Sequence, residues 1–107
     1  VLIKSSKTNV FVMFHSPTCG TCQQTYEPFN QLANEMKDFD IVFAKADAWM
    51  NDFPDWLQLS GVPDLRLFAK GEEYKNNKEF SDPDRTVEKM KEWLQKKGVS
   101  LNTHNKQ

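Results

Sequence analysis

Cys19 and Cys22 are the residues whose type and spacing could do chemistry, and they are the two cysteines of the chain. A cysteine thiolate is a nucleophile that attacks disulfides. Because two residues separate the pair, the second thiol can reach back and displace a partner bound to the first. The spacing therefore indicates a dithiol–disulfide switch, in which Cys19 attacks and Cys22 resolves.

Two other roles for the same pair have less support. A Cys-x-x-Cys pair can be half of a zinc site, but structural zinc usually takes four protein ligands. There is no further cysteine, and only His15 and His104 remain as imidazole ligands, with His104 in a polar tail. A purely structural disulfide would close a very short loop and contribute little stability. We therefore expect no metal and no cofactor.

The segments around the cysteines predict a strand that leads into a helix. Val10–Phe14 has the length and the β-branched and aromatic content of a buried strand, which Ser16 and Pro17 interrupt. A helix is expected over about residues 19–37. Its apolar face comprises Cys22, Tyr26, Phe29, Ala33 and Met36. Because unpaired N–H groups at a helix N-terminus stabilise anions, the pKa of a thiol placed there can fall from about 8.5 into roughly the 3.5–7.5 range.

The composition indicates one soluble globular domain. Of 107 residues, 38% are hydrophobic and 27% charged, which suffices for a core. Fourteen basic and fifteen acidic side chains leave a net charge of −1, so no basic surface for nucleic acid is indicated. No apolar run is long enough to span a membrane. We expect the domain over residues 1–98 and a flexible polar tail over residues 99–107.

The remaining segments predict an α/β architecture. Strands are expected at 41–47 and 65–68, and a more polar edge strand, interrupted by Asn76-Asn77, at 72–80. A short helix is expected between 51 and 60, and a last helix between 82 and 98. The order begins with a strand–helix–strand unit, whose two strands should be parallel, and ends in a hairpin with a closing helix.

Together these motifs resemble a thioredoxin-fold domain and, within that superfamily, the catalytic domain of a protein disulfide isomerase. The resemblance covers roughly residues 9–97. It rests on the strand and loop ending in Cys19-Gly-Thr-Cys22, on Ala44-Lys-Ala-Asp-Ala48, on Gly61-Val-Pro63 and on the closing helix. It implies a three-layer sandwich with a central mixed sheet and helices on both faces. A full domain has another strand and helix before Val10, so we expect a truncated or a minimal four-stranded version.

Several departures from the family pattern bear on the chemistry. An aromatic residue usually precedes the first cysteine, where this chain has Thr18, and Gly-His usually separates the cysteines, where it has Gly20-Thr21. Threonine lacks the charge of an imidazolium, so Cys19 should be less acidic and the disulfide less oxidising than in other isomerases. The family's buried acid, which takes the proton of the resolving cysteine, falls on Met13, while its usual lysine neighbour is retained as Lys45.

The resemblance also assigns roles outside the cysteine pair. Arg85 matches the arginine that moves toward the resolving cysteine in isomerases. Pro63 matches the cis-proline that shapes the loop beside the sulfurs, and the backbone of Val62 would pair with an extended substrate strand. Thr18, Gly20 and Thr21 form the rest of the active-site loop.

The implied function is that of a thiol–disulfide oxidoreductase of the isomerase type, acting on cysteine-containing proteins or peptides without nucleic acid or membrane partners. We expect a monomeric domain of a larger chain in the endoplasmic reticulum lumen or secretory pathway. Two alternatives remain open. Met13 and Thr18 favour a weakly redox-active peptide-binding or chaperone module, and the missing histidine favours a cytosolic thioredoxin-like reductant.

Overall fold

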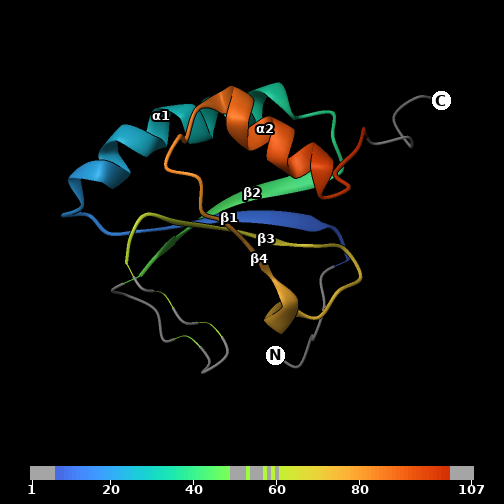
Figure 1. The fold of residues 1–107 in the computed structure, drawn as a ribbon, viewed down its shortest axis with the longest axis horizontal. Coiled ribbons are helices and arrows are strands. Elements are labelled where there is room, and N and C mark those ends of the chain that lie inside the picture. The colour runs from blue at the N-terminus through green and yellow to red at the C-terminus, as the bar shows by residue number, and fades with distance from the viewer. Residues whose placement is uncertain (1–6, 49–52, 54–56, 58, 60, 102–107) are drawn as a thin grey trace.

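The chain forms a mixed four-stranded sheet (Figure 1). The computed structural model describes residues 7–48, 53, 57, 59 and 61–101. Its strands are β1 (Asn9–His15), β2 (Ile41–Asp47), β3 (Asp64–Phe68) and β4 (Lys78–Phe80). They lie in the order β2-β1-β3-β4, with β1 parallel to β2 and antiparallel to β3, and β3 antiparallel to β4. The predicted mixed sheet and its four-stranded form are confirmed.

Two helices lie side by side on one face of this sheet (Figure 1). They are α1 (Gly20–Glu35), which connects the parallel strands β1 and β2, and α2 (Val87–Lys96), which follows β4. The helix expected between 51 and 60 falls almost wholly outside the described residues, so a helical layer on the second face remains a prediction. Neither of the described helices is long and apolar enough to cross a membrane.

The hydrophobic core lies between the sheet and the two helices. Because side chains alternate along a strand, one set from β1 and β3 faces α1 and α2. The buried cluster includes Phe11, Met13, Leu65 and Leu67 of the sheet, Cys22, Phe29 and Leu32 of α1, and Met90 and Leu94 of α2. The expected apolar face of α1 needs one correction. Tyr26 and Ala33 are only half-buried, whereas Thr25 and Leu32 are buried. Because an α-helix has 3.6 residues per turn, the buried face is centred on the side of the helix that Thr25 and Leu32 occupy.

The strand expected over 72–80 is wrong for the part that precedes the interruption at Asn76-Asn77. Only Lys78–Phe80 pairs with β3, and a short 3-10 helix, η1 (Tyr74–Asn76), precedes it. The Asn77 side chain donates a hydrogen bond from Nδ2 to the carbonyl oxygen of Tyr74 at 2.8 Å. Asparagine side chains commonly close turns in this way, which competes with strand pairing.

The packed domain continues beyond residue 98, so the expected start of the tail is also corrected. Gly98 ends α2 with a φ of 101°, and the Val99 N–H donates to the carbonyl of Leu94, which closes the helix end. Val99 is buried in the core cluster. The carbonyl of Ser100 accepts a hydrogen bond from the Asp40 N–H at 2.8 Å, which ties this segment to the start of β2.

Candidate active site

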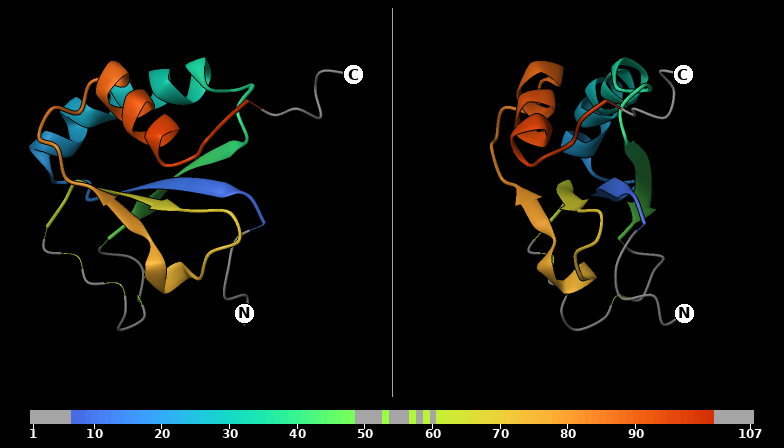
Figure 2. Two further views of the ribbon diagram at one scale, coloured as in Figure 1. Left: turned by 45° about the vertical axis from the view of Figure 1, so that its right-hand side comes forward. Right: turned by 90° about the vertical axis from the view of Figure 1, so that its right-hand side faces the viewer.

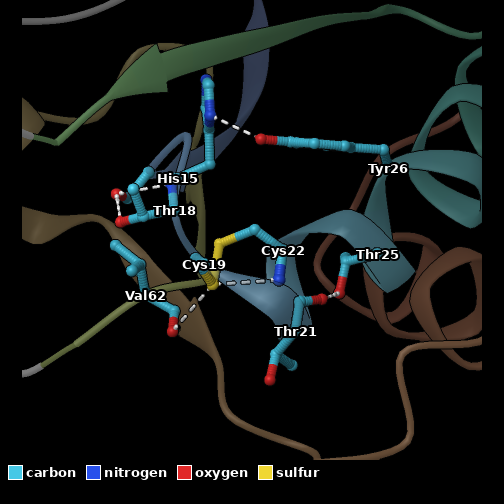
Figure 3. The surroundings of a disulfide bond; sticks show 9 residues. His15, Thr18, Cys19, Thr21, Cys22, Thr25, Tyr26 and Val62 are labelled. Atoms are coloured by element: carbon cyan, nitrogen blue, oxygen red, sulfur yellow. Dashed lines mark hydrogen bonds between the residues drawn. A yellow bond between two sulfur atoms is a disulfide. The ribbon is translucent and has the colours of Figure 1, made fainter.

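The cysteine pair lies where β1 leads into α1, as the sequence predicts (Figure 3). Cys19 is the N-cap of α1, with extended backbone angles, and its N–H donates to the carbonyl of Ser16 at 3.1 Å. A disulfide joins it to Cys22 in the first turn, across a Cα–Cα distance of 5.2 Å. Cys19 therefore lies at the N-terminus of α1, after the loop that follows β1, and Cys22 lies within the helix.

The Cys19 sulfur caps the helix. The Cys22 N–H donates to Cys19 Sγ at 3.0 Å, so the sulfur takes the place that a serine or threonine oxygen holds at many helix N-termini. The first turn of α1 contains no acidic residue. The unpaired amides of this turn and the positive end of the helix dipole therefore favour a thiolate at Cys19.

The two sulfurs differ in accessibility. Cys22 is 0% exposed and belongs to the hydrophobic core, whereas Cys19 is partly exposed. Its loop neighbours Thr18, Gly20 and Thr21 are exposed as well. A substrate can therefore reach Cys19 from solvent, while Cys22 can act only from the interior of the domain. This asymmetry supports the assignment of Cys19 as attacking and Cys22 as resolving residue.

The loop before β3 lies against the attacking sulfur. The Val62–Pro63 peptide bond is cis, which confirms the prediction made for it. The carbonyl oxygen of Val62 lies 3.7 Å from Cys19 Sγ (Figure 3). Both loop residues are half-buried. The structure thus brings together, from segments more than forty residues apart, the cysteine and the loop that the sequence associated with it.

The position of the family's buried acid is filled by an apolar side chain. Met13 is 0% exposed, in the same core cluster as Cys22. Lys45 is its partner in the β1–β2 register, as expected for the lysine neighbour. Because Met13 has no carboxylate with which Lys45 could pair, the Lys45 ammonium lies over the ring of Tyr26, with Nζ 5.5 Å from the ring centroid. Met13 offers no group that could accept a proton from Cys22.

One polar contact beside the pair was not anticipated from the sequence. Tyr26 Oη and His15 Nδ1 are 2.8 Å apart, and the two rings pack edge to face (Figure 3). The sequence pattern places Tyr26 on the apolar face of the helix and offers His15 only as a possible metal ligand. The available signal was that Tyr26 lies one helical turn beyond Cys22. Within the described residues, no group of three or more His, Cys, Asp or Glu side chains could hold a metal ion.

Arg85 is not connected to the pair by any polar contact. It is half-buried in the segment before α2, and no hydrogen bond or ion pair joins it to the described residues around the cysteines. Its catalytic role remains a prediction.

Sequence comparisons place the chain among known proteins. The family model described as Thioredoxin matches residues 1–96. The chain is 32% identical over 98 residues to the protein disulfide-isomerase of Aspergillus oryzae, covering 91% of this chain and 18% of that protein. It is 31% identical over 102 residues to the human protein disulfide-isomerase A4, covering 94% of this chain and 16% of that protein. The chain thus spans less than a fifth of the length of these relatives.

Solved structures share the fold. The first thioredoxin domain of mouse protein disulfide-isomerase A4 matches with a TM-score of 0.69 and 27% identity, over 85% of this chain and 64% of that one. The Trx4 domain of ERdj5 matches with a TM-score of 0.71 and 22% identity, over 89% and 83% of the two chains. The second match, at this identity, supports the fold alone.

Proposed function

The chain belongs to the thioredoxin family, and we propose that it is a thiol–disulfide oxidoreductase domain of the protein disulfide isomerase type. The observation that carries the proposal is the capped, partly exposed Cys19 sulfur in front of a fully buried Cys22. Relatives named protein disulfide-isomerase support it, because they align with nearly the whole chain. They are much longer than this chain, so we propose that it acts as one domain of a larger protein.

The reaction begins at Cys19. Its thiolate attacks one sulfur of a substrate disulfide, the substrate S–S bond breaks, and the departing substrate sulfur takes up a proton. A mixed disulfide between Cys19 and the substrate remains. Cys22 then loses its proton and attacks Cys19 Sγ, which releases the second substrate sulfur as a thiol. The substrate has gained two electrons, and the domain is left with the Cys19–Cys22 disulfide. The reverse sequence oxidises a substrate dithiol.

The surroundings of Cys19 give each further residue a proposed role. The half-buried Val62 backbone, whose carbonyl lies 3.7 Å from the sulfur, would pair with an extended peptide, and Pro63 would shape this segment. Thr18, Gly20 and Thr21 form the exposed rim around the sulfur. The Arg85 charge would favour the Cys22 thiolate on approaching it.

The substrates would be proteins or peptides with cysteines. The resemblance to protein disulfide isomerases supports a site of action in the endoplasmic reticulum lumen or the secretory pathway. Localising the full-length protein by fluorescence would test this part of the proposal, and retention in the cytoplasm would contradict it.

A second function is favoured by one observation. Because Met13 is fully buried where the family carries an acid, Cys22 lacks that proton acceptor, and the domain could bind peptides with little redox turnover. Insulin reduction in the presence of dithiothreitol distinguishes the two. Acceleration above the dithiothreitol background supports the oxidoreductase, whereas peptide binding without acceleration supports the binding module.

A further inference from the structure

A buried acid follows the loop that lies against Cys19. The Asp64 side chain is 3% exposed, and a carboxylate so far from water is costly unless it is paired and hydrogen-bonded. Arg66 provides both. Its Nε donates to Asp64 Oδ1 at 2.7 Å and its Nη2 to Oδ2 at 3.1 Å. These two parallel bonds form the bidentate arrangement, which fixes orientation as well as distance.

The pair is part of a longer chain of contacts. Arg66 Nη1 donates to Asn77 Oδ1 at 3.1 Å, and Asn77 in turn closes the turn at Tyr74. The hydrogen bonds that Arg66 donates to Asp64 raise the pKa of Arg66, and the charge of Glu79, opposite Arg66 in β4, acts in the same direction. The guanidinium therefore stays charged. The network joins the residue after Pro63 to the connection between β3 and β4.

This network is separate from the helical core. Because side chains alternate along β3, Leu65 and Leu67 face α1 and α2, while Asp64 and Arg66 face the opposite side of the sheet. The connection from β3 to β4 extends on that side, away from the helices (Figure 2). The most direct connection from Asp64 to Cys19 therefore runs along the backbone, by way of Pro63 and Val62.

We propose that Asp64 and Arg66 are positioning residues that hold the Val62–Pro63 segment against Cys19 for peptide binding. The inference rests on the proposed function. Replacing a buried ion pair by apolar residues of similar volume is often neutral or stabilising, so stability alone does not account for it. Its bidentate geometry instead fixes the backbone at Asp64, one residue past the proline. A displaced segment would carry the Val62 carbonyl away from its place 3.7 Å from Cys19 Sγ.

The experiment compares two substrates. A disulfide-bonded peptide would use the Val62 backbone, whereas the small aromatic disulfide dithiobis(nitrobenzoic acid) needs only the Cys19 thiolate. Asp64→Asn keeps the shape and removes the charge, and Arg66→Lys keeps the charge but cannot form the bidentate fork. In each variant we expect the KM for the peptide to rise about tenfold, the effect of weakening one charge-assisted hydrogen bond, with kcat unchanged. The reaction with the small disulfide should keep its rate.

Matched variants separate this role from a structural one. Lys70→Met removes an exposed ion pair with Asp40, away from the Asp64–Arg66 network, and should alter neither reaction. If a single variant fails to fold, the double variant Asp64→Leu/Arg66→Met removes both charges together and supplies the same comparison.

Each outcome decides something. Equal losses on both substrates in folded variants, or an unchanged peptide KM, would overturn the positioning role. A natural protein that reduces neither substrate would instead overturn the proposed function.

Discussion

The N-termini of α1 and α2 are both capped by a side chain, but the two caps have different roles. In α1 the Cys22 N–H donates to the side chain of Cys19 at 3.0 Å, and in α2 the Lys89 N–H donates to the side chain of Thr86 at 3.3 Å. Both capping residues have extended backbone angles, and each side chain accepts a hydrogen bond from the N–H of the residue three positions later. The backbone at the two caps is therefore of the same extended class.

The difference lies in the capping atom and its neighbours. The first turn of α2 carries Glu88, whose charge complements the helix dipole, whereas the first turn of α1 carries no acid. At α1 the positive end of the helix dipole therefore acts on the Cys19 sulfur instead of on a carboxylate. A second cysteine, absent at α2, then turns a cap into a redox pair. The difference between the two helices therefore comes from the capping atom, sulfur in Cys19 and oxygen in Thr86, because both caps have extended backbone angles.

The sharpest test exchanges the capping atom of α1 alone. Serine caps helices well but forms no disulfide, so Cys19→Ser should keep the fold and reduce insulin turnover to background. Circular dichroism of the reduced proteins would check the fold, and insulin turbidity the activity. Turnover above background in the variant would show that Cys19 is not the attacking residue.

The second largest effect is expected from changing Met13, which lies in the same core cluster as Cys22. General-base help is typically worth about 10²–10⁴-fold, so Met13→Glu should speed the release of a substrate trapped on Cys19 by up to that range. Lys45, its register partner, would keep part of the new carboxylate ionised. The rate is measured on a preformed mixed disulfide, and the new buried carboxyl should also cost stability.

Met13→Gln, similar in size but unable to take up the proton, is the matched control. If release is unchanged while the glutamate variant remains folded, Met13 is a core residue only, and proton removal from Cys22 does not limit the reaction.

A smaller effect separates the two sulfurs of the reduced protein. Cys19 is partly exposed and caps the helix, while Cys22 is buried, so iodoacetamide at neutral pH should label Cys19 several-fold faster. Peptide mapping by mass spectrometry after short exposures would give both rates. Faster labelling of Cys22 would reverse the assigned roles.

The smallest effect is expected at the other helix. Thr86→Ala removes the cap of α2 and should cost about 1 kcal/mol, which lowers the Tm of a domain of this size by about 4–8 °C. Insulin turnover per folded molecule should not change. Thr86→Ser, which keeps the capping hydroxyl, should restore the Tm, and a loss of turnover in Thr86→Ala would show that the two helix ends are coupled.

The elements with regular patterns were predictable. The apolar run of β1, the limits of β2 and the place of Cys19 at a helix N-terminus follow from local periodicity and turn residues. The four strands also follow from the order of the segments. These features depend on residues close together in the sequence.

The features that escaped prediction depend on side chains that meet only in the folded chain. Asp64 beside a proline has the composition of a turn, and its buried pairing with Arg66 requires knowledge of which face of β3 is covered. The contact between His15 and Tyr26 joins a strand end to a helix face. In the expected strand at 72–80, the interruption at Asn76-Asn77 was predictable, but the 3-10 helix before it, which the Asn77 side chain closes, was not.

The burial of Cys22 has a consequence for anything that regulates this domain. Its amide N–H donates to the Cys19 sulfur, so the helix backbone as well as the disulfide holds the two cysteines together. Of the two cysteine sulfurs, a visiting molecule can touch only that of Cys19, since Cys22 has no exposed surface. In the proposed oxidoreductase, reductant, oxidant and substrate would therefore compete for the same Cys19 sulfur, and this competition would limit the turnover of the domain.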